Sequence, residues 1–142
     1  MKKYKIGYTQ GVFDMLHIGH LNLLNAAKER CEYLIVGINS DALVQSYKNK
    51  TPVIKAQERA EIVRNLKSVD ECIIVDSLDK EQILKIKDFQ VIFIGDDWKG
   101  NPRWEQTKIN MQKYGVDVVF LKHTKGISST QLRPEYESKV DG

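Results

Sequence analysis

The chain contains few of the residues that covalent cross-links and metal centres require. Its 142 residues include only two cysteines and three histidines. Cys31 and Cys72 have neither the spacing of a metal site nor that of a redox pair, so we expect two buried free thiols and a reducing, cytoplasmic location. With so few thiols and imidazoles, we do not expect a structural zinc site.

Long apolar runs and a strong charge of one sign are also missing. No stretch approaches the roughly 20 apolar residues that a membrane helix requires, and the basic N-terminus lacks the hydrophobic core of a secretion signal. The net charge of +3 suits a small anionic substrate but is too weak to indicate nucleic acid. We therefore expect neither a membrane nor a nucleic acid as a partner.

Short apolar runs alternate with helical patterns along the chain. The runs are rich in β-branched residues and lie at 5–9, 33–38, 72–75, 91–94 and 116–121. The helical patterns between them lie at 18–30, 56–66, 80–87 and 104–114. This order predicts an α/β fold, a doubly wound (Rossmann-like) parallel sheet with helices on both faces in a single domain. We place that domain at 1–133 and a peripheral tail at 134–142, and we predict a loop over 45–55, which contains a proline and three lysines.

Two histidines lie three residues apart in the segment GVFDMLHIGH, residues 11–20. The segment follows the first apolar run and precedes a helical pattern, which predicts a strand, a glycine-bearing turn and a helix. Gly11 and Gly19 allow the backbone to approach a ligand closely. His17 and His20 fall near the helix start, where unpaired N–H groups and the helix dipole favour an anion. The segment therefore predicts a phosphate site.

Two further motifs follow later apolar runs. GDDWKG, residues 95–100, comes directly after one run, and GISST, residues 126–130, follows the last run after a short spacer. Ligands of open parallel sheets bind beyond the carboxyl ends of the strands, at the switch point of strand order. We therefore expect the three motifs to converge on one pocket. The hydroxyl groups of GISST either cap a short helix or bind phosphate there.

Together the three motifs resemble those of the H-x-G-H nucleotidylyltransferases, most closely the glycerol-3-phosphate cytidylyltransferases, from about Tyr4 to Arg133. H-x-G-H marks a superfamily that also contains adenylyltransferases and class I aminoacyl-tRNA synthetases, whereas GDDW with GISST is typical of the cytidylyltransferase branch and indicates CTP. The resemblance implies transfer of CMP from CTP to a small phosphorylated alcohol, with glycerol 3-phosphate as the first candidate. The products would be pyrophosphate and CDP-glycerol, used for an envelope polymer such as teichoic acid or capsule.

The resemblance also assigns site residues. His17, His20 and Lys48 form the catalytic set, in which the histidines donate hydrogen bonds to the transferring phosphate. A larger set is expected to bind the nucleotide: Gly11, Val12, Phe13, Asp14, Gly19, Lys50, Asp96, His123, Gly126, Ile127, Ser128, Ser129 and Thr130.

The residues alone leave several of these roles open. Lys48 and Lys50 suit a polyphosphate as flexible point charges, but they also fit a solvated loop. Asp14 either orients a cation or caps the turn. Asp96 either orders the pocket or accepts a hydrogen bond from the cytosine amino group.

The resemblance assigns no metal ligand in the protein. Mg²⁺ is expected to bind mainly through the nucleotide phosphates. Residues 66–71 match a stretch that relatives place at their subunit contact, so a homodimer is expected. An ordinary helix-to-strand turn is the alternative interpretation of that stretch.

The sequence departs from the family pattern at three places. Val12 replaces a threonine and supplies no hydroxyl group. His123 stands where the family has an arginine and lacks that residue's bidentate contact to phosphate, for which Lys122, Lys125 or Arg133 are candidates to compensate. The segment after Val75, which contributes to the acceptor site in relatives, matches poorly.

Two other functions are compatible with these motifs. One is an adenylyltransferase acting on a phosphorylated sugar or cofactor precursor. The other is a non-catalytic nucleotide-binding protein, although binding alone would not require both histidines.

Overall fold

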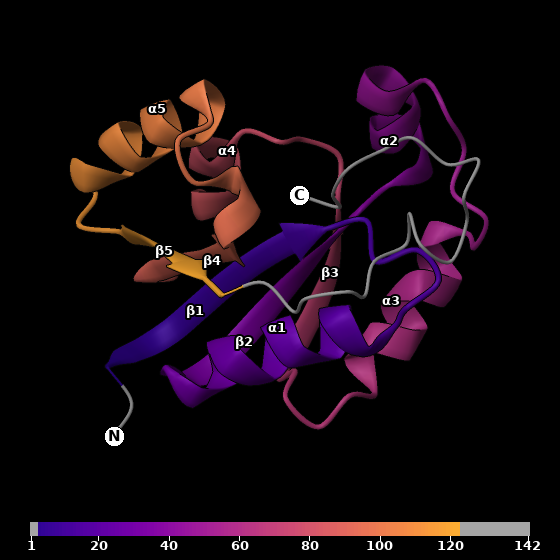
Figure 1. The fold of residues 1–142 in the computed structure, drawn as a ribbon, viewed down its shortest axis with the longest axis horizontal. Coiled ribbons are helices and arrows are strands. Elements are labelled where there is room, and N and C mark those ends of the chain that lie inside the picture. Colours follow the sequence, from indigo (N-terminus) through magenta and orange to yellow (C-terminus); the bar gives the residue numbers. More distant parts are fainter. Residues whose placement is uncertain (1–2, 123–142) are drawn as a thin grey trace.

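Five parallel strands form one sheet in the computed structural model, which describes residues 3–122. The strand order is β3-β2-β1-β4-β5, and every neighbouring pair is parallel (Figure 1). The strands are β1 (Tyr4–Gly11), β2 (Cys31–Asn39), β3 (Glu71–Val75), β4 (Val91–Gly95) and β5 (Asp117–Leu121). The predicted α/β fold with a parallel sheet is confirmed.

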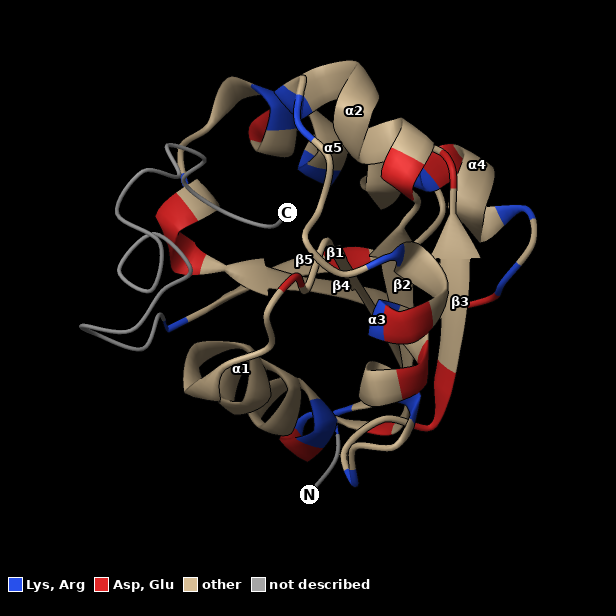
Figure 2. Ribbon diagram, turned by 90° about the vertical axis from the view of Figure 1, so that its right-hand side faces the viewer, with Lys and Arg blue, Asp and Glu red and all other residues tan. Residues whose placement is uncertain are grey.

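Helices cover both faces of this sheet. They are α1 (Ile18–Glu29), α2 (Asp41–Lys48), α3 (Ala56–Arg64), α4 (Lys80–Leu84) and α5 (Pro102–Gln112), with a 3₁₀ turn η1 (Asp96–Trp98) after β4. Helices α1 and α3 lie on one side of the sheet, and α4 and α5 lie on the other side together with α2 (Figure 2). Each side buries its own apolar cluster. Because the central strands are covered twice, their apolar runs are continuous and do not alternate.

The two clusters fix the helices to the sheet. On one side, α1 and α3 pack on β2 and β4 through Leu24, Ala27, Ala60, Val63, Leu34, Val36 and Phe93. On the other side, α4 and α5 pack on β1 and β4 through Ile83, Trp104, Met111, Tyr8 and Ile92. Full burial of one large apolar side chain stabilises a fold by about 1.5–3 kcal/mol. This packing therefore holds the ends of β1 and β4 rigid.

Two expectations from the sequence require correction. The predicted loop 45–55 is wrong at its start, because α2 continues to Lys48 and the loop begins at Asn49, whose φ of 56° ends the helix. Helix α2 has only eight residues and buries only Val44. Cys31 is buried as predicted, but Cys72 is only partly buried, because β3 is an edge strand.

The strand order reverses direction at β1, which pairs with β2 on one side and with β4 on the other. The chain moves outward from β1 through β2 to β3, and then returns to β4 on the opposite side. Ligands of such sheets bind at this switch point, beyond the carboxyl ends of the strands. The segments found there are the turn after Gly11 and the 3₁₀ turn η1.

Candidate active site

The turn between β1 and α1 holds an unusual backbone. Phe13 and Met15 have φ angles of 53° and 51°, a region that costs a residue other than glycine about 1–3 kcal/mol. The side chains of Val12 and Phe13 are buried, and this packing holds the turn in its strained form. The buried side chains of Val12 and Phe13 cannot contact a ligand outside the core, which leaves backbone groups for that purpose.

The histidine pair forms the start of α1. His17 is the N-cap residue, and its Nδ1 accepts a hydrogen bond from the Gly19 amide at 3.0 Å. The Nδ1 of His20 accepts from the His17 amide at 3.2 Å. The two rings stack with their centroids 3.9 Å apart, and Phe13 lies against the His20 ring with a centroid distance of 5.4 Å.

These contacts define the tautomer of both rings. A nitrogen that accepts a hydrogen bond carries no proton, so each neutral imidazole carries its proton on Nε2. The two Nε2–H groups of His17 and His20 are therefore hydrogen-bond donors at the N-terminus of a helix, where the helix dipole favours an anion. The sequence predicted this grouping, but it did not show that Nδ1 of each ring also caps the helix.

Asp14 connects this turn to the lysine-bearing loop. Its carboxylate is buried and accepts hydrogen bonds from the amides of Val53 at 2.8 Å and Ile54 at 3.0 Å. Asp14 therefore orients the loop 49–55 through its backbone. Lys50 lies in this loop, and Lys48 is the last residue of α2.

The sequence patterns did not indicate Arg59 of α3, although this residue contacts several segments of the candidate site. Its guanidinium donates to the carbonyl oxygens of Val12, Asn39 and Ile54 at 2.7–2.9 Å and forms an ion pair with Asp41 at 2.6 Å. The side chain is only 1% exposed. The sequence contains one indication that Arg59 is buried. It lies on the face of α3 that also buries Ala56, Ala60 and Val63.

A chain of side-chain hydrogen bonds, buried at its β1 end, links α2 to the strand ends. The Tyr8 hydroxyl donates to Gln10 Oε1 at 2.6 Å, and Gln10 Nε2 donates to Asn39 Oδ1 at 2.9 Å. Asn39 Nδ2 then donates to the Tyr47 hydroxyl at 3.0 Å. Tyr47 directly precedes Lys48, so this network connects the lysine to the ends of β1 and β2.

The remaining predicted residues fall into two groups. Gly11 ends β1, Gly19 lies in the first turn of α1, and Asp96 begins η1 at the end of β4. These residues lie at the carboxyl edge of the sheet, as the sequence predicted. His123, Gly126, Ile127, Ser128, Ser129 and Thr130 lie outside the described residues.

The comparison with protein families agrees with this geometry. Residues 8–135 match a family model described as cytidylyltransferase-like. The chain belongs to the cytidylyltransferase-like family. This family consists of nucleotidyltransferases, and the matched residues include both histidines of the candidate site.

The relatives of this cytidylyltransferase-like chain are named for different functions. It is 34% identical over 128 residues to the glycerol-3-phosphate cytidylyltransferase of Bacillus subtilis, covering 89% of this chain and 93% of that protein. It is 37% identical over 132 residues to the bifunctional protein HldE of Caulobacter vibrioides, but it spans only 26% of that protein. It is 36% identical over 114 residues to the FAD synthase of Thermococcus kodakarensis, covering 79% and 74% of the two chains.

Solved structures support the fold. The lipopolysaccharide core biosynthesis protein of Thermoplasma volcanium matches with a TM-score of 0.72 at 24% identity, over 87% of this chain and 99% of that one. The pantoate-beta-alanine ligase of Francisella tularensis matches with a TM-score of 0.64 at 16% identity, over 93% and 66% of the two chains. At these identities the likeness shows the architecture alone. Within residues 3–122, no helix is long and apolar enough to cross a membrane.

Asp14→Asn tests whether the carboxylate holds the loop. The amide side chain keeps one acceptor oxygen and turns an N–H donor toward a backbone N–H, so one loop amide loses its partner. We expect the amide protons of Val53 and Ile54 to exchange at least about tenfold faster, the equivalent of about 1.4 kcal/mol. Asp76→Asn, at an exposed aspartate after β3, is the matched control. Unchanged exchange at both amides in Asp14→Asn would show that the loop is held by other contacts.

Proposed function

We propose that the protein transfers CMP from CTP to a small phosphorylated alcohol and releases pyrophosphate, with glycerol 3-phosphate as the reference acceptor. The observation that carries the proposal is the pair of Nε2–H donors of His17 and His20 at the N-terminus of α1. The glycerol-3-phosphate cytidylyltransferase of Bacillus subtilis adds support, because the alignment covers most of both chains.

The reaction requires charge neutralisation more than proton transfer. A phosphate oxygen of the acceptor attacks the α-phosphorus of CTP, a new P–O bond forms, and the bond to the bridging oxygen breaks as pyrophosphate leaves with the electron pair. A phosphate monoester is mostly ionised at neutral pH because its second pKa is about 6, so no general base is needed. The two imidazole N–H groups would stabilise the charge that develops on the α-phosphate.

Lys48 and Lys50 would contact the phosphate groups of CTP and of the acceptor. Lys48 ends α2 and directly follows Tyr47, whose hydroxyl accepts a hydrogen bond from Asn39. Lys50 lies in the loop that Asp14 holds. Two point charges at these places suit the polyphosphate of CTP and the incoming acceptor phosphate.

A magnesium ion would enter with the nucleotide as part of the substrate. Mg²⁺ keeps several of its waters and binds through substrate phosphates in sites of this kind. The described part of the chain has no group of three or more histidine, cysteine, aspartate or glutamate side chains that could hold a metal ion. The donor set near His17 and His20 fits phosphate oxygens and not the metal itself.

An adenylyltransferase is the second candidate. It is favoured by the FAD synthase of Thermococcus kodakarensis, to which the chain is 36% identical. The same histidine pair would serve this reaction equally well, since both reactions transfer a nucleotidyl group. The choice between the two depends on which base is accepted.

His17→Asn separates catalysis from helix capping. Asparagine is among the best N-cap residues, and its Oδ1 can replace the Nδ1 that accepts from the Gly19 amide. The substitution removes the Nε2–H donor. We therefore expect kcat to fall by about 10²-fold or more, as for other lost transition-state donors, while the free energy of unfolding stays within about 0.5 kcal/mol.

His17→Ala is the matched comparison, because it removes both the donor and the cap. It should lose the same activity and also about 1 kcal/mol of stability. His20→Ala should lower kcat by about 10²-fold or more as well. Near-normal turnover in folded His17→Asn would remove the assigned role of the ring.

Base choice is tested by measuring pyrophosphate release with CTP, UTP and ATP. Polar groups that pair with cytosine are left unpaired by another base, at about 1–3 kcal/mol each. Two such losses total about 2–6 kcal/mol, so we expect a preference for CTP over ATP in kcat/KM of at least about thirtyfold. UTP differs from CTP at the amino group and tests that contact directly. Equal turnover of ATP and CTP would replace the cytidylyl proposal with the adenylyl one.

The magnesium requirement has its own test, which is to measure activity in excess chelator. We expect activity to be lost, and full activity under these conditions would exclude the requirement.

A further inference from the structure

The position of Lys48, the last residue of helix α2, depends on how the end of this helix is held. Apolar packing of the helix rests on Val44, the only residue that α2 buries. An ion pair between Asp41 and Arg59 at 2.6 Å holds the start of the helix. The other end lies about two turns further on. A contact near Lys48 is therefore needed to hold that end as well.

Tyr47 supplies such a contact beside Lys48. Its hydroxyl accepts a hydrogen bond from Asn39 Nδ2 at 3.0 Å, and Asn39 is the fully buried last residue of β2. The Lys48 Nζ lies 6.0 Å from the centroid of the Tyr47 ring, about the limit at which an aromatic face attracts a cation. A phenol ring that is held at its hydroxyl therefore presents a defined face to the ammonium group.

The direction of the Asn39 amide follows from the chain of hydrogen bonds behind it. The Ser77 carbonyl oxygen can only accept, so the group of Gln10 that lies 3.0 Å from it is the Nε2 donor. The other N–H of this Nε2 points to Asn39 Oδ1 at 2.9 Å, which turns Asn39 Nδ2 toward Tyr47. Gln10 Oε1 accepts from the Tyr8 hydroxyl at 2.6 Å. Burial raises the pKa of the Tyr8 phenol, so this donor keeps its proton.

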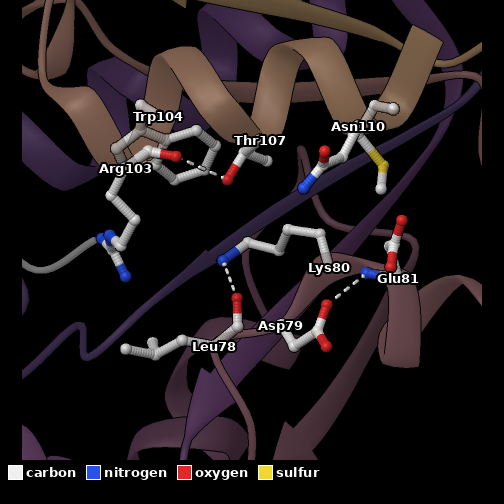
Figure 3. A pocket seen from close by; sticks show the side chains of 9 residues that line it. Leu78, Asp79, Lys80, Glu81, Arg103, Trp104, Thr107 and Asn110 are labelled. Atoms are coloured by element: carbon white, nitrogen blue, oxygen red, sulfur yellow. Dashed lines mark hydrogen bonds between the residues drawn. The ribbon is translucent and has the colours of Figure 1, made fainter.

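The acceptor that sets this direction belongs to a segment with an anchor of its own. The carbonyl of Leu78, next to Ser77, accepts a hydrogen bond from the buried Lys80 Nζ at 2.9 Å. Leu78 and Lys80 line a cavity of about 240 Å³ between α4 and α5 (Figure 3). Two successive carbonyls are thus bound by different side chains, Gln10 from β1 and Lys80 from α4. The orientation of the Gln10 amide, and through it that of Asn39, is therefore determined by the packing of the sheet.

We propose that Asn39 is a positioning residue for nucleotidyl transfer, which acts through the Tyr47 ring on the place where the Lys48 ammonium meets a substrate phosphate. This inference rests on the proposed function, in which Lys48 contacts phosphate, and adds the residues that act through that lysine. Gln10 acts in the same way, one hydrogen bond further from the site. Stabilisation of a transition state depends on where a charge is placed, and a displacement of about 1 Å can lower a rate by about 10²-fold.

The test is a double-mutant cycle of Tyr47→Phe with Lys48→Met, measured as kcat for pyrophosphate release from CTP with glycerol 3-phosphate. Tyr47→Phe removes the hydroxyl and keeps the ring. We expect it to lower kcat by about tenfold when Lys48 is present. In the Lys48→Met background the same change should cost less than about twofold, because no ammonium group is left to position. Equal losses in both backgrounds would show that the hydroxyl acts independently of Lys48 and would overturn the inference.

Tyr33→Phe is the matched control. Tyr33 is 39% exposed and Tyr47 is 38% exposed. The Tyr33 hydroxyl also forms a hydrogen bond, to Glu71 at 2.8 Å, but near the amino end of β2 and away from the candidate site. This substitution should leave kcat unchanged. A loss as large as that of Tyr47→Phe would contradict a specific role for the Tyr47 hydroxyl.

Asn39→Leu tests the amide itself. Leucine has a similar size and no donor for the Tyr47 hydroxyl, so kcat should fall at least as far as in Tyr47→Phe. Adding Tyr47→Phe to Asn39→Leu should cost nothing more, because both substitutions break the same hydrogen bond. A full additional loss in the double variant would show that Tyr47 acts without Asn39. If Asn39→Leu does not fold, the cycle with Lys48 still decides.

Amide hydrogen exchange tests the anchor without turnover. The Asn49 amide closes the last turn of α2, and the Val44 amide closes its first turn. Tyr47→Phe should make the Asn49 amide exchange about tenfold faster and leave the Val44 amide unchanged. Unchanged exchange at Asn49 would show that other contacts hold this end and would overturn the inference. If the wild-type protein releases no pyrophosphate with any nucleotide and phosphomonoester, the proposed function fails, and exchange at Asn49 separately decides whether Asn39 anchors α2.

Discussion

The buried guanidinium of Arg59 is the interaction on which the arrangement of the site depends. Removing one charged group from water costs several kcal/mol even after the protein relaxes. Arg59 offsets that cost only because three backbone carbonyls and the Asp41 carboxylate surround it. Those partners belong to the turn after β1, the end of β2, the start of α2 and the loop after it. One side chain therefore joins four segments of the candidate site.

The strained turn between β1 and α1 is stable for a related reason. Positive φ angles at Phe13 and Met15 would relax if the surrounding contacts were weak. The ring of Phe13 packs in the core and against His20, and the Val12 carbonyl is held by Arg59. The turn directs the chain so that His17 becomes the N-cap of α1. The capping bonds to Nδ1 then leave both Nε2–H groups as donors.

The parts of the structure that sequence could predict are those with a local signal. Continuous apolar runs such as 91–94 predicted buried parallel strands, and the spacing of His17 and His20 predicted a pair at one helix start. Helix α2 was missed because it spans only about two turns and buries a single side chain. The role of Asp14 was left open, since its partners are amides about forty residues away. Local patterns carry no information on such distant backbone partners.

Cations in this protein have two distinct environments, and the difference explains why composition alone was uninformative. Lys50 lies in the loop after α2 and is partly exposed. Lys80 has the same side chain but is 4% exposed, and its pKa is lowered to about 7 by burial. A net charge of +3 counts both residues equally. Burial disfavours the charged form of Lys80, whereas a partly exposed lysine is desolvated less. The burial of Lys80 follows from the packing of α4 and α5 on the sheet, and composition does not record such packing.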